Sequence, residues 1–359
     1  MIIFNAIGFV VLKNYPSRLL LKKHFYYKLV QQEMYYINFL KIVPQENKMI
    51  ILTGAAGFIG SVLLYYLNKN GINDIICVDR LGCGDKWKNL IGKQFVELID
   101  YDIFFKQYNK LLNDVEMIIH LGACVSTTEQ DMDYLLNINY RYTKEIFNLC
   151  QKNKIRFLYA SSASTYGNGK QGFSETNLQL EPLNKYGYSK HLFDIWWQRH
   201  PTSNQCVGLK FFNVYGPNEY HKGKMSSLIY QFYQQIVKNA TITIYGNDGL
   251  QSRDFVYVKD AVDVMLYFIF HSEISGIYNV GSGQDTEFNT IAKLVIEMGK
   301  RPAKIEYTPI PDNLSSGYQK ITRANLNKLR EVGYQKNFTS IKEGIHDYIT
   351  QYLLKHKYL

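Results

Sequence analysis

A glycine-rich turn near residue 54 constrains the fold of this chain more than any other feature. Gly54, Gly57 and Gly60 stand at GxxGxxG spacing, directly after the apolar run Ile50–Thr53 and at the start of the helical stretch Ile59–Asn70. In such a strand–turn–helix unit the first glycine permits a tight turn, the second lets a pyrophosphate approach the backbone, and the third lets the helix pack closely on the strand. The pyrophosphate then meets the free N–H groups at the start of the helix. The sequence therefore predicts a dinucleotide-binding site at this turn.

An acidic residue follows at the position where a ribose-binding group is expected. Asp79 ends the next apolar run, and its carboxylate can accept hydrogen bonds from both ribose hydroxyls, which favours NAD. Arg80 and Lys86 come directly after it and could instead pair with the 2′-phosphate of NADP. These residues alone leave the choice between the two cofactors open.

Alternation of strand-like and helix-like segments predicts the fold class. Apolar, β-branched runs recur at Ile50–Thr53, Ile75–Val78, Phe95–Ile99, Met117–Leu121, Phe157–Ser161, Val207–Phe212, Phe255–Val258 and Ile277–Val280. Helical stretches between the earlier runs include Ile59–Asn70, Tyr134–Gln151 and Tyr186–Arg199. This order is typical of an α/β protein with a doubly wound, Rossmann-type parallel sheet. We expect a nucleotide domain at 49–215 and, mainly from 216–359, a smaller α/β substrate domain whose chain crosses back to the sheet.

Residues 1–48 differ from the rest of the chain. They hold seven basic and two acidic residues and so account for half of the net charge of +10. The apolar run at residues 1–12 is too short to span a bilayer, and its positive charges follow it, unlike those of a secretory signal. We expect a non-essential extension, with a membrane-surface anchor as the alternative.

Charge and cysteine content give no specific indication of nucleic-acid binding or of a metal site. The remaining charge is spread without blocks and no nucleic-acid-binding motif occurs, so a basic pocket for a phosphorylated ligand explains it as well as a nucleic-acid surface would. The five cysteines show no metal-ligand spacing, which predicts reduced thiols in a cytoplasmic protein without a metal site.

The candidate catalytic residues lie in two later segments. Ser162 stands at the carboxyl end of the run Phe157–Ser161, at the sheet edge where ligands of open α/β sheets bind. Tyr186 and Lys190 are spaced i,i+4 and so share one face of a helix. A phenol has an ordinary pKa near 10, and a neighbouring ammonium together with a positive nicotinamide lowers it. We expect Tyr186 to exchange a proton with a substrate alcohol while hydride moves between the substrate carbon and the cofactor.

This order of motifs resembles the extended short-chain dehydrogenase/reductases that act on nucleotide sugars. Dehydratases of that family carry an Asp-Glu pair after the serine strand, where this chain has Ala163 and Ser164. The resemblance therefore counts against a dehydratase.

Longer stretches are similar to the ADP-L-glycero-D-manno-heptose 6-epimerases of that family. They are GAAGFIGS at 54–61, HLGACVSTTE at 120–129, PLNKYGYSKHLFD at 182–194, FFNVYGPNEYHKGKM at 211–225 and SRDFVYVKD at 252–260, and the resemblance covers about residues 49–355. The chain departs from the pattern at Lys224 and at 245–248, both on the expected substrate side.

The resemblance implies a role for each matching residue. The implied catalytic residues are Tyr186, Lys190, Ser162 and Lys222, the last as a second acid/base. The implied NADP contacts, with NAD as the alternative cofactor, are Gly54, Gly57, Phe58, Ile59, Gly60, Asp79, Arg80, Lys86, Gly122, Ala123, Cys124, Asn139, Lys190, Val214 and Lys222. The implied substrate contacts are Ser162, Asn213, Lys224, Gln231, Tyr245, Gly246, Asn247, Asp248, Arg253 and Tyr318.

The implied reaction inverts one carbon of ADP-D-glycero-D-manno-heptose, and its product supplies lipopolysaccharide core. Removal of hydride gives a planar ketone, and return of hydride to the other face inverts the centre without net redox change. The oxygen of that carbon then points to two different places, so Tyr186 would serve one epimer and Lys222 the other. The resemblance also implies a cytoplasmic homo-oligomer, pentameric in family members, with no nucleic-acid partner and no stable membrane span. An epimerase or reductase of another nucleotide sugar, and a non-catalytic dinucleotide-binding scaffold, stay open as alternatives.

Overall fold

The computed structural model describes residues 49–107, 112, 114–177, 179–200, 206–246, 249–311, 319 and 321–359. Lys48–Leu359 forms one compact unit, whose described residues are the subject of everything that follows. The expectations for residues 1–48 lie outside the described residues. None of the described helices is long and apolar enough to cross a membrane.

The main sheet has seven strands in the order β10-β6-β5-β4-β1-β2-β3, and every neighbouring pair is parallel. The strands are β1 (Met49–Thr53), β2 (Ile75–Asp79), β3 (Glu97–Asp100), β4 (Val115–His120), β5 (Arg156–Ser162), β6 (Cys206–Phe211) and β10 (Gly276–Val280). The order reverses between β1 and β4, as in doubly wound folds, and the last strand to join comes from beyond residue 215. The predicted fold class is confirmed.

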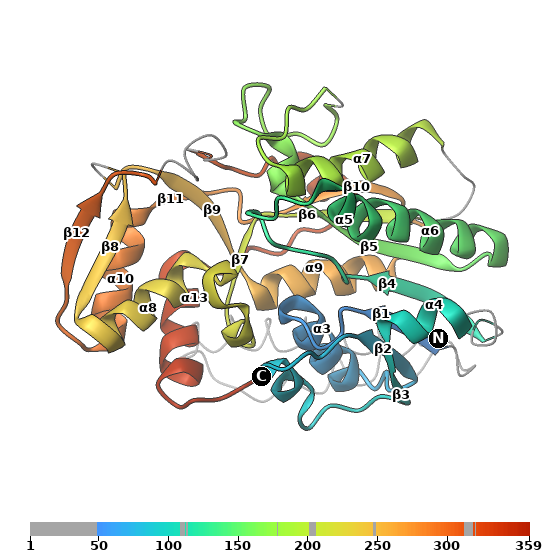
Figure 1. Ribbon diagram of the computed structural model, residues 1–359, viewed down its shortest axis with the longest axis horizontal. Helices are drawn as coiled ribbons and strands as arrows, with labels where there is room; N and C mark the ends of the chain where they lie inside the picture. The colour runs from blue at the N-terminus through green and yellow to red at the C-terminus, as the bar shows by residue number, and fades with distance from the viewer. Residues whose placement is uncertain are drawn as a thin grey trace, which may run out of the picture. The chain divides into compact units, whose positions relative to one another are not determined.

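Helices cover both faces of this sheet (Figure 1). The flanking helices are α3 (Phe58–Lys69), α4 (Tyr101–Gln107), α5 (Met132–Leu135), α6 (Tyr142–Asn153), α7 (Lys185–Arg199) and α9 (Val258–Phe270). Successive strand residues point to opposite faces, so Ile50 and Leu52 pack with α3 and α9, whereas Ile51 packs with α4, α6 and α7. Two apolar layers therefore hold the sheet between its helices.

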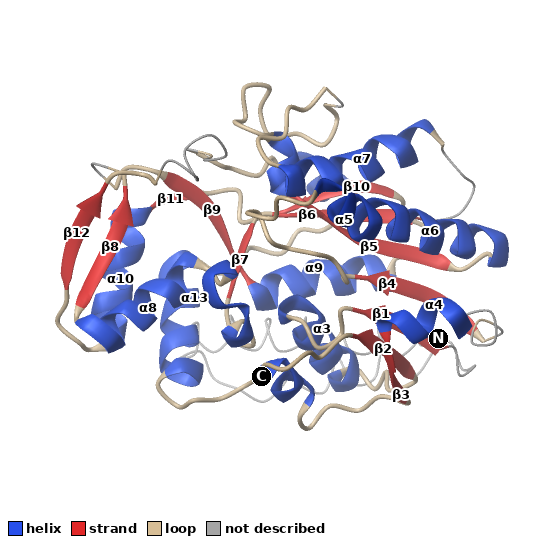
Figure 2. Ribbon diagram, in the orientation of Figure 1, coloured by secondary structure: helices blue, strands red, loops and turns tan. Residues whose placement is uncertain are grey.

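A second group of elements adjoins the carboxyl ends of the strands (Figure 2). A three-stranded sheet pairs β11 (Asp285–Glu287), β9 (Ser252–Tyr257) and β7 (Asn213–Tyr215), and a parallel pair joins β12 (Lys304–Thr308) to β8 (Thr241–Tyr245). The helices that follow along the chain are α8 (Leu228–Asn239), α10 (Phe288–Gly299), α12 (Asn327–Glu331) and α13 (Ile341–Asp347). A π-helical segment, η6 (Tyr348–Leu353), continues α13. Short 3₁₀ segments are η1 (Asp85–Leu90), η4 (Ala163–Tyr166) and η5 (Tyr220–Met225).

The predicted helix Tyr134–Gln151 differs from what the structure has. α5 and α6 are separated by a π-helical segment, η3 (Leu136–Arg141), that contains the buried residue Asn139. The wider π turn changes the direction of the side chains on one face, and such turns recur at functional sites. The predicted strands differ from the observed ones by two residues or fewer at each end, except that β9 begins three residues before the predicted start at Phe255.

Candidate active site

A cavity of about 1010 Å³ opens along the carboxyl ends of the main strands. The loops after β1, β2 and β4, the end of β5, helix α7 and the segment η5 all contribute to its lining. This is the edge where open α/β sheets bind ligands, at the point where the strand order reverses.

The glycine-rich turn forms one end of the cavity and has room only for glycine. Gly54 has φ +71°, and a Cβ there would lie 2.7 Å from Gly122 N. A Cβ at Gly60 would overlap Gly54 O and lie 2.9 Å from its carbonyl carbon. The turn therefore holds β1, α3 and the loop after β4 in backbone contact. The first residues of α3, Phe58 to Gly60, line the cavity, at the helix end where free N–H groups can bind a pyrophosphate.

Asp79 lies buried at the end of β2, with 8% of its surface exposed. Its carboxylate accepts hydrogen bonds from Ala56 N at 2.8 Å and from Arg80 N at 2.7 Å, and it forms an ion pair with Lys86. Arg80 forms an ion pair with Asp102, and its guanidinium lies 5.3 Å from the ring centroid of Tyr101. Arg80 and Lys86 thus flank the predicted ribose site, each already paired with an acid.

Asn139 supports the loop after β4, part of the cavity lining, through hydrogen bonds to the backbone of that loop. Its side chain accepts from Cys124 N at 2.9 Å and donates to Cys124 O at 3.0 Å and to Ser189 Oγ at 3.0 Å. Asn139 is 1% exposed and is not among the residues that line the cavity. It acts on the predicted cofactor loop, Gly122 to Cys124, through that loop's backbone.

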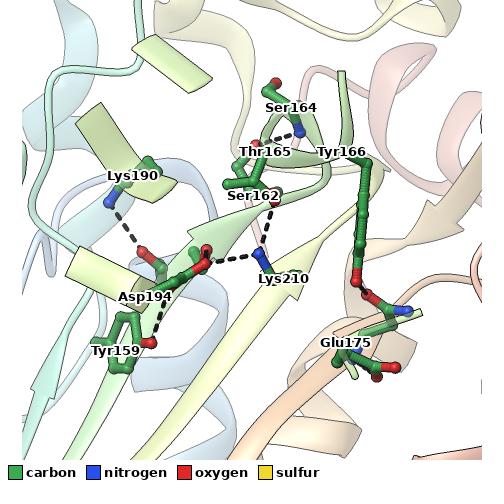
Figure 3. Close-up of polar contacts among 12 residues, drawn as sticks. Tyr159, Ser162, Ser164, Thr165, Tyr166, Glu175, Lys190, Asp194 and Lys210 are labelled. Atoms are coloured by element: carbon green, nitrogen blue, oxygen red, sulfur yellow. Dashed lines mark hydrogen bonds and ion pairs between the residues drawn. The ribbon is translucent and has the colours of Figure 1, made fainter. Parts of the chain in front are cut away.

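Tyr186, Lys190 and Ser162 all line the cavity. Asn184 caps helix α7 by accepting from Gly187 N at 2.7 Å, which fixes the turn that carries Tyr186. One turn later, Lys190 Nζ donates to Ala160 O at 2.8 Å, so the ammonium is held against the end of β5 (Figure 3). Ser162, the last residue of β5, accepts from Ser164 N at 3.1 Å and hydrogen-bonds Tyr186.

Burial dominates the electrostatics of this group. It raises the pKa of Tyr186, and the hydrogen bond with Ser162 offsets only part of that increase. Burial also lowers the pKa of Lys190 to about 8, against an opposing contribution from the Asp194 carboxylate. Among the chain's own groups, desolvation of the Tyr186 phenolate is the largest effect on its pKa. That Lys190 and a bound, positively charged nicotinamide together lower this pKa stays a prediction.

Lys222 lines the cavity from the segment η5, a different element from α7. Its Nζ is 5.0 Å from the ring centroid of Phe58, the first residue of α3. The buried Glu219 accepts from Ser227 Oγ at 2.7 Å and from Gly216 N at 3.1 Å, and so ties the two ends of this segment together. Burial lowers the pKa of Lys222, and the nearby Glu219 carboxylate opposes this shift.

His221 also lines the cavity beside Lys222, although it was not among the expected site residues. Its Nδ1 lies 3.3 Å from Asn89 Nδ2, and Asn89 also donates to Ala56 O at 2.9 Å and to Asn218 O at 3.0 Å. Burial and the charges of Lys86 and Lys222 lower the pKa of His221 to about 4. The basic HKGK run was the available signal, and Asn89 connects it to the glycine-rich turn.

The expected substrate residues divide into three groups. Ser162, Asn213, Gln231, Tyr245 and Arg253 line the cavity, as does the expected cofactor residue Val214. Lys224 and Gly246 are not among the lining residues, and Asn247, Asp248 and Tyr318 lie outside the described residues.

Arg253 is the charged group of the substrate side. It is 8% exposed, donates to Ser252 O at 2.8 Å, and its guanidinium lies 5.5 Å from the ring centroid of Phe288. Phe255 and Phe288 also line this end of the cavity and were not predicted, because isolated aromatic residues in a chain with 20 Phe give no signal.

Comparison with known proteins agrees with this geometry. A model of the NAD dependent epimerase/dehydratase family matches residues 50–281. The ADP-L-glycero-D-manno-heptose-6-epimerase of Nitratidesulfovibrio vulgaris (strain DP4) is 43% identical over 316 residues, which are 85% of this chain and 98% of that protein.

Solved structures of similar proteins share the fold. The ADP-L-glycero-D-manno-heptose-6-epimerase of Helicobacter pylori matches with a TM-score of 0.76 at 28% identity, over 86% of this chain and 98% of that one. The UDP-glucuronic acid 4-epimerase of Bacillus cereus, solved with UDP-glucuronic acid and NAD, matches with a TM-score of 0.71 at 26% identity, over 84% of this chain and 99% of that one.

Proposed function

This chain belongs to the NAD dependent epimerase/dehydratase family, and from that premise we propose that it interconverts ADP-D-glycero-D-manno-heptose and ADP-L-glycero-D-manno-heptose. One observation carries the proposal: a single cavity is lined by the glycine-rich turn, by the group of Tyr186, Lys190 and Ser162, and by Lys222 on a different element. The similarity to curated heptose epimerases supports the choice of sugar.

The proposed cofactor is NADP, which would supply the acceptor and donor of hydride. Gly54, Gly57 and Gly60 would admit its pyrophosphate, and Asp79 its ribose. Arg80 and Lys86, on the rim of that ribose site, would pair with the 2′-phosphate. The remaining proposed contacts are Phe58, Ile59, Gly122, Ala123, Cys124, Val214 and Lys190, with Asn139 acting through the loop that it supports.

Tyr186 and Lys222 would act as the two acid/base groups. Tyr186 would take the hydroxyl proton of one epimer, with Ser162 hydrogen-bonding the same oxygen and Lys190 stabilising the phenolate. Lys222 would do the same for the other epimer, because the inverted carbon presents its oxygen to a different wall. Burial lowers the pKa of Lys222 and so favours the neutral amine that a base requires.

Arg253 would clamp the diphosphate of the substrate, since a guanidinium is shaped to bind phosphate oxygens with two hydrogen bonds. Asn213, Gln231 and Tyr245 line the same part of the cavity and would contact the nucleotide sugar. Lys224 and Gly246 do not line the cavity. Their proposed part in substrate binding would therefore depend on the loops that contain them.

The wider setting is also part of the proposal. We propose that the protein acts in the cytoplasm, as a homo-oligomer, and that it supplies heptose for lipopolysaccharide core. Residues 49–215 would form the nucleotide domain, 216–359 would form mainly the substrate domain, and 1–48 would be dispensable.

Turnover of purified protein tests the substrate. We expect ADP-D-glycero-D-manno-heptose to be converted to a mixture of epimers, read by the sugar-proton NMR signals, while UDP-glucose and GDP-mannose are left unchanged. Conversion of a UDP- or GDP-sugar in place of the ADP-heptose would overturn the proposed substrate and keep the family. Mass spectrometry of nucleotide released from the same protein identifies the cofactor.

A further inference from the structure

We propose that a buried ion pair behind the active site, Asp194 with Lys210, positions the catalytic group and sets the protonation state of Lys190. Asp194 and Lys210 are each 2% exposed, and neither is among the lining residues of the cavity. The proposal rests on the function given above only through the catalytic role of Lys190.

The carboxylate of Asp194 is the centre of a cluster of donors. It accepts from Lys210 Nζ at 2.6 Å, from Ser161 Oγ at 2.7 Å and from Tyr159 OH at 2.8 Å. Figure 3 shows the bonds from Lys210 and Tyr159. Tyr159 and Ser161 point to one face of β5 and Ser162 follows on the other, and both serines line the cavity. Asp194 on α7 therefore fixes the strand end that carries Ser162.

Lys210 makes the second connection to Ser162. Its Nζ donates to Thr165 Oγ1 at 2.7 Å, and that hydroxyl in turn donates to Ser162 O at 2.8 Å. The ammonium also lies 5.0 Å from the ring centroid of Tyr166. Ser162 is thus held on both sides by groups that the ion pair orients.

The third connection is electrostatic and runs along α7. Asp194 follows Lys190 by one helical turn, so their side chains lie on one face, and Lys190 Nζ is anchored on Ala160 O between Tyr159 and Ser161. Burial favours the neutral amine of Lys190, and the Asp194 carboxylate opposes this. Lys210 pairs with that carboxylate at 2.6 Å and so weakens its field at Lys190.

Other titratable groups also face the two residues. Lys190 is faced by Tyr186 on its own helix, His120 on β4 and Cys124 in the loop after β4. Asp194 is faced by His191 on α7, Tyr159 on β5, Tyr166 on η4, and Lys210 and Cys206 on β6. Among these groups, Asp194 contributes most to raising the pKa of Lys190, ahead of Cys124. The buried His120, whose pKa is lowered to about 3, is neutral.

Stability alone does not explain such a pair. Two buried charges lose their hydration, and apolar residues of the same volume stabilise such positions equally well or better. The cluster therefore does what apolar residues could not do. It acts on the catalytic ammonium of Lys190, one helical turn away on α7.

The test titrates Lys190 directly. Protein labelled with ¹³C at lysine Cε, with its cofactor bound, gives a ¹³C NMR signal that follows the protonation of each lysine. The Lys190 signal is the one lost in Lys190→Gln. The variants are Asp194→Asn, Lys210→Met and the double variant, and the alkaline limb of the kcat profile is the second readout.

The expected shifts have opposite signs. Asp194→Asn removes the anion that stabilises the Lys190 ammonium, so its titration and the alkaline limb move to lower pH, by roughly one pH unit or more. Lys210→Met leaves the anion unopposed and moves both to higher pH. The double variant falls between wild type and Asp194→Asn, because Asp194 is the nearer charge.

Equal losses of activity in both single variants, with the Lys190 titration unchanged, would overturn the proposal and leave the pair purely structural. If a single variant does not fold, the double variant decides alone, because it leaves no charge unpaired: an unchanged Lys190 titration there also overturns the proposal. The NMR titration needs no sugar, so it stands apart from failure of the proposed substrate.

Discussion

At the scale of single residues, Tyr186 shows what sequence reasoning can and cannot supply. The i,i+4 spacing with Lys190 predicted that the two side chains share a helix face, and both line the cavity. Spacing carries no information on burial, which raises the pKa of the phenol and lowers that of the amine. Tyr186 can therefore act as a base only when nearby positive charges, those of Lys190 and of the bound cofactor, stabilise its phenolate.

Cofactor selection depends on the two cations beside Asp79. Arg80→Ala should reduce the preference for NADP⁺ over NAD⁺ about tenfold or more, because a charge-assisted contact contributes roughly 1.5–3 kcal/mol. The measurement is the ratio of dissociation constants for the two cofactors. Lys88→Ala is the matched control. Lys88 lies in η1, two residues after Lys86, but it pairs with Asp85 and does not line the cavity. Wild-type protein that binds NAD⁺ more tightly would show that Asp79 decides instead.

At the scale of elements, the glycine-rich turn is the part that sequence predicted most completely. Each glycine has a steric reason that follows from the strand–turn–helix geometry alone. The π segment η3 was not predicted, because the apolar pattern of Tyr134–Gln151 reads as one continuous helix and a single wide turn leaves the pattern nearly unchanged. The resemblance implied Asn139 as a cofactor contact, but its support of the Cys124 backbone depends on the local geometry and was not predicted.

Gly60→Ala should separate α3 from β1. The new Cβ would overlap Gly54 O, and relief of such overpacking typically costs about 1–3 kcal/mol. We expect a lower free energy of unfolding and a loss of bound cofactor, measured by thermal melting and by the nucleotide content of purified protein. Gly299→Ala, at the end of α10 with no atom within 4 Å of its Cβ, should change neither. Wild-type cofactor content in Gly60→Ala would contradict the steric account.

At the scale of the whole molecule, sequence predicted the sheet but not the contacts that close the site. Hydrophobic periodicity gave most strands of the doubly wound sheet within one or two residues. The last residues of the chain pack on the segment around Lys222: Leu359 N donates to Asn218 Oδ1 at 2.8 Å, and Tyr220 OH donates to Lys357 O at 2.8 Å. Contacts across such a long stretch of sequence leave no local pattern that could predict them.

Deletion of residues 2–48 should leave stability and turnover unchanged, because β1 begins at Met49 and Lys48–Leu359 is a compact unit. The melting temperature and the epimerisation rate of the truncated protein check this. An insoluble or inactive product would assign the extension a structural role.

The central claim is that two acid/base groups on different walls of one cavity serve the two epimers. Its most direct measurement is the rate of epimerisation of ADP-D-glycero-D-manno-heptose by Lys222→Met, with Tyr186→Phe beside it and the bound nucleotide quantified in both. Each variant should keep its fold and cofactor, and each should lose on the order of 10²–10⁴-fold in rate, because each blocks one half of the reaction. Epimerisation by Lys222→Met at close to the wild-type rate would contradict the account, since Tyr186 would then serve both orientations of the sugar.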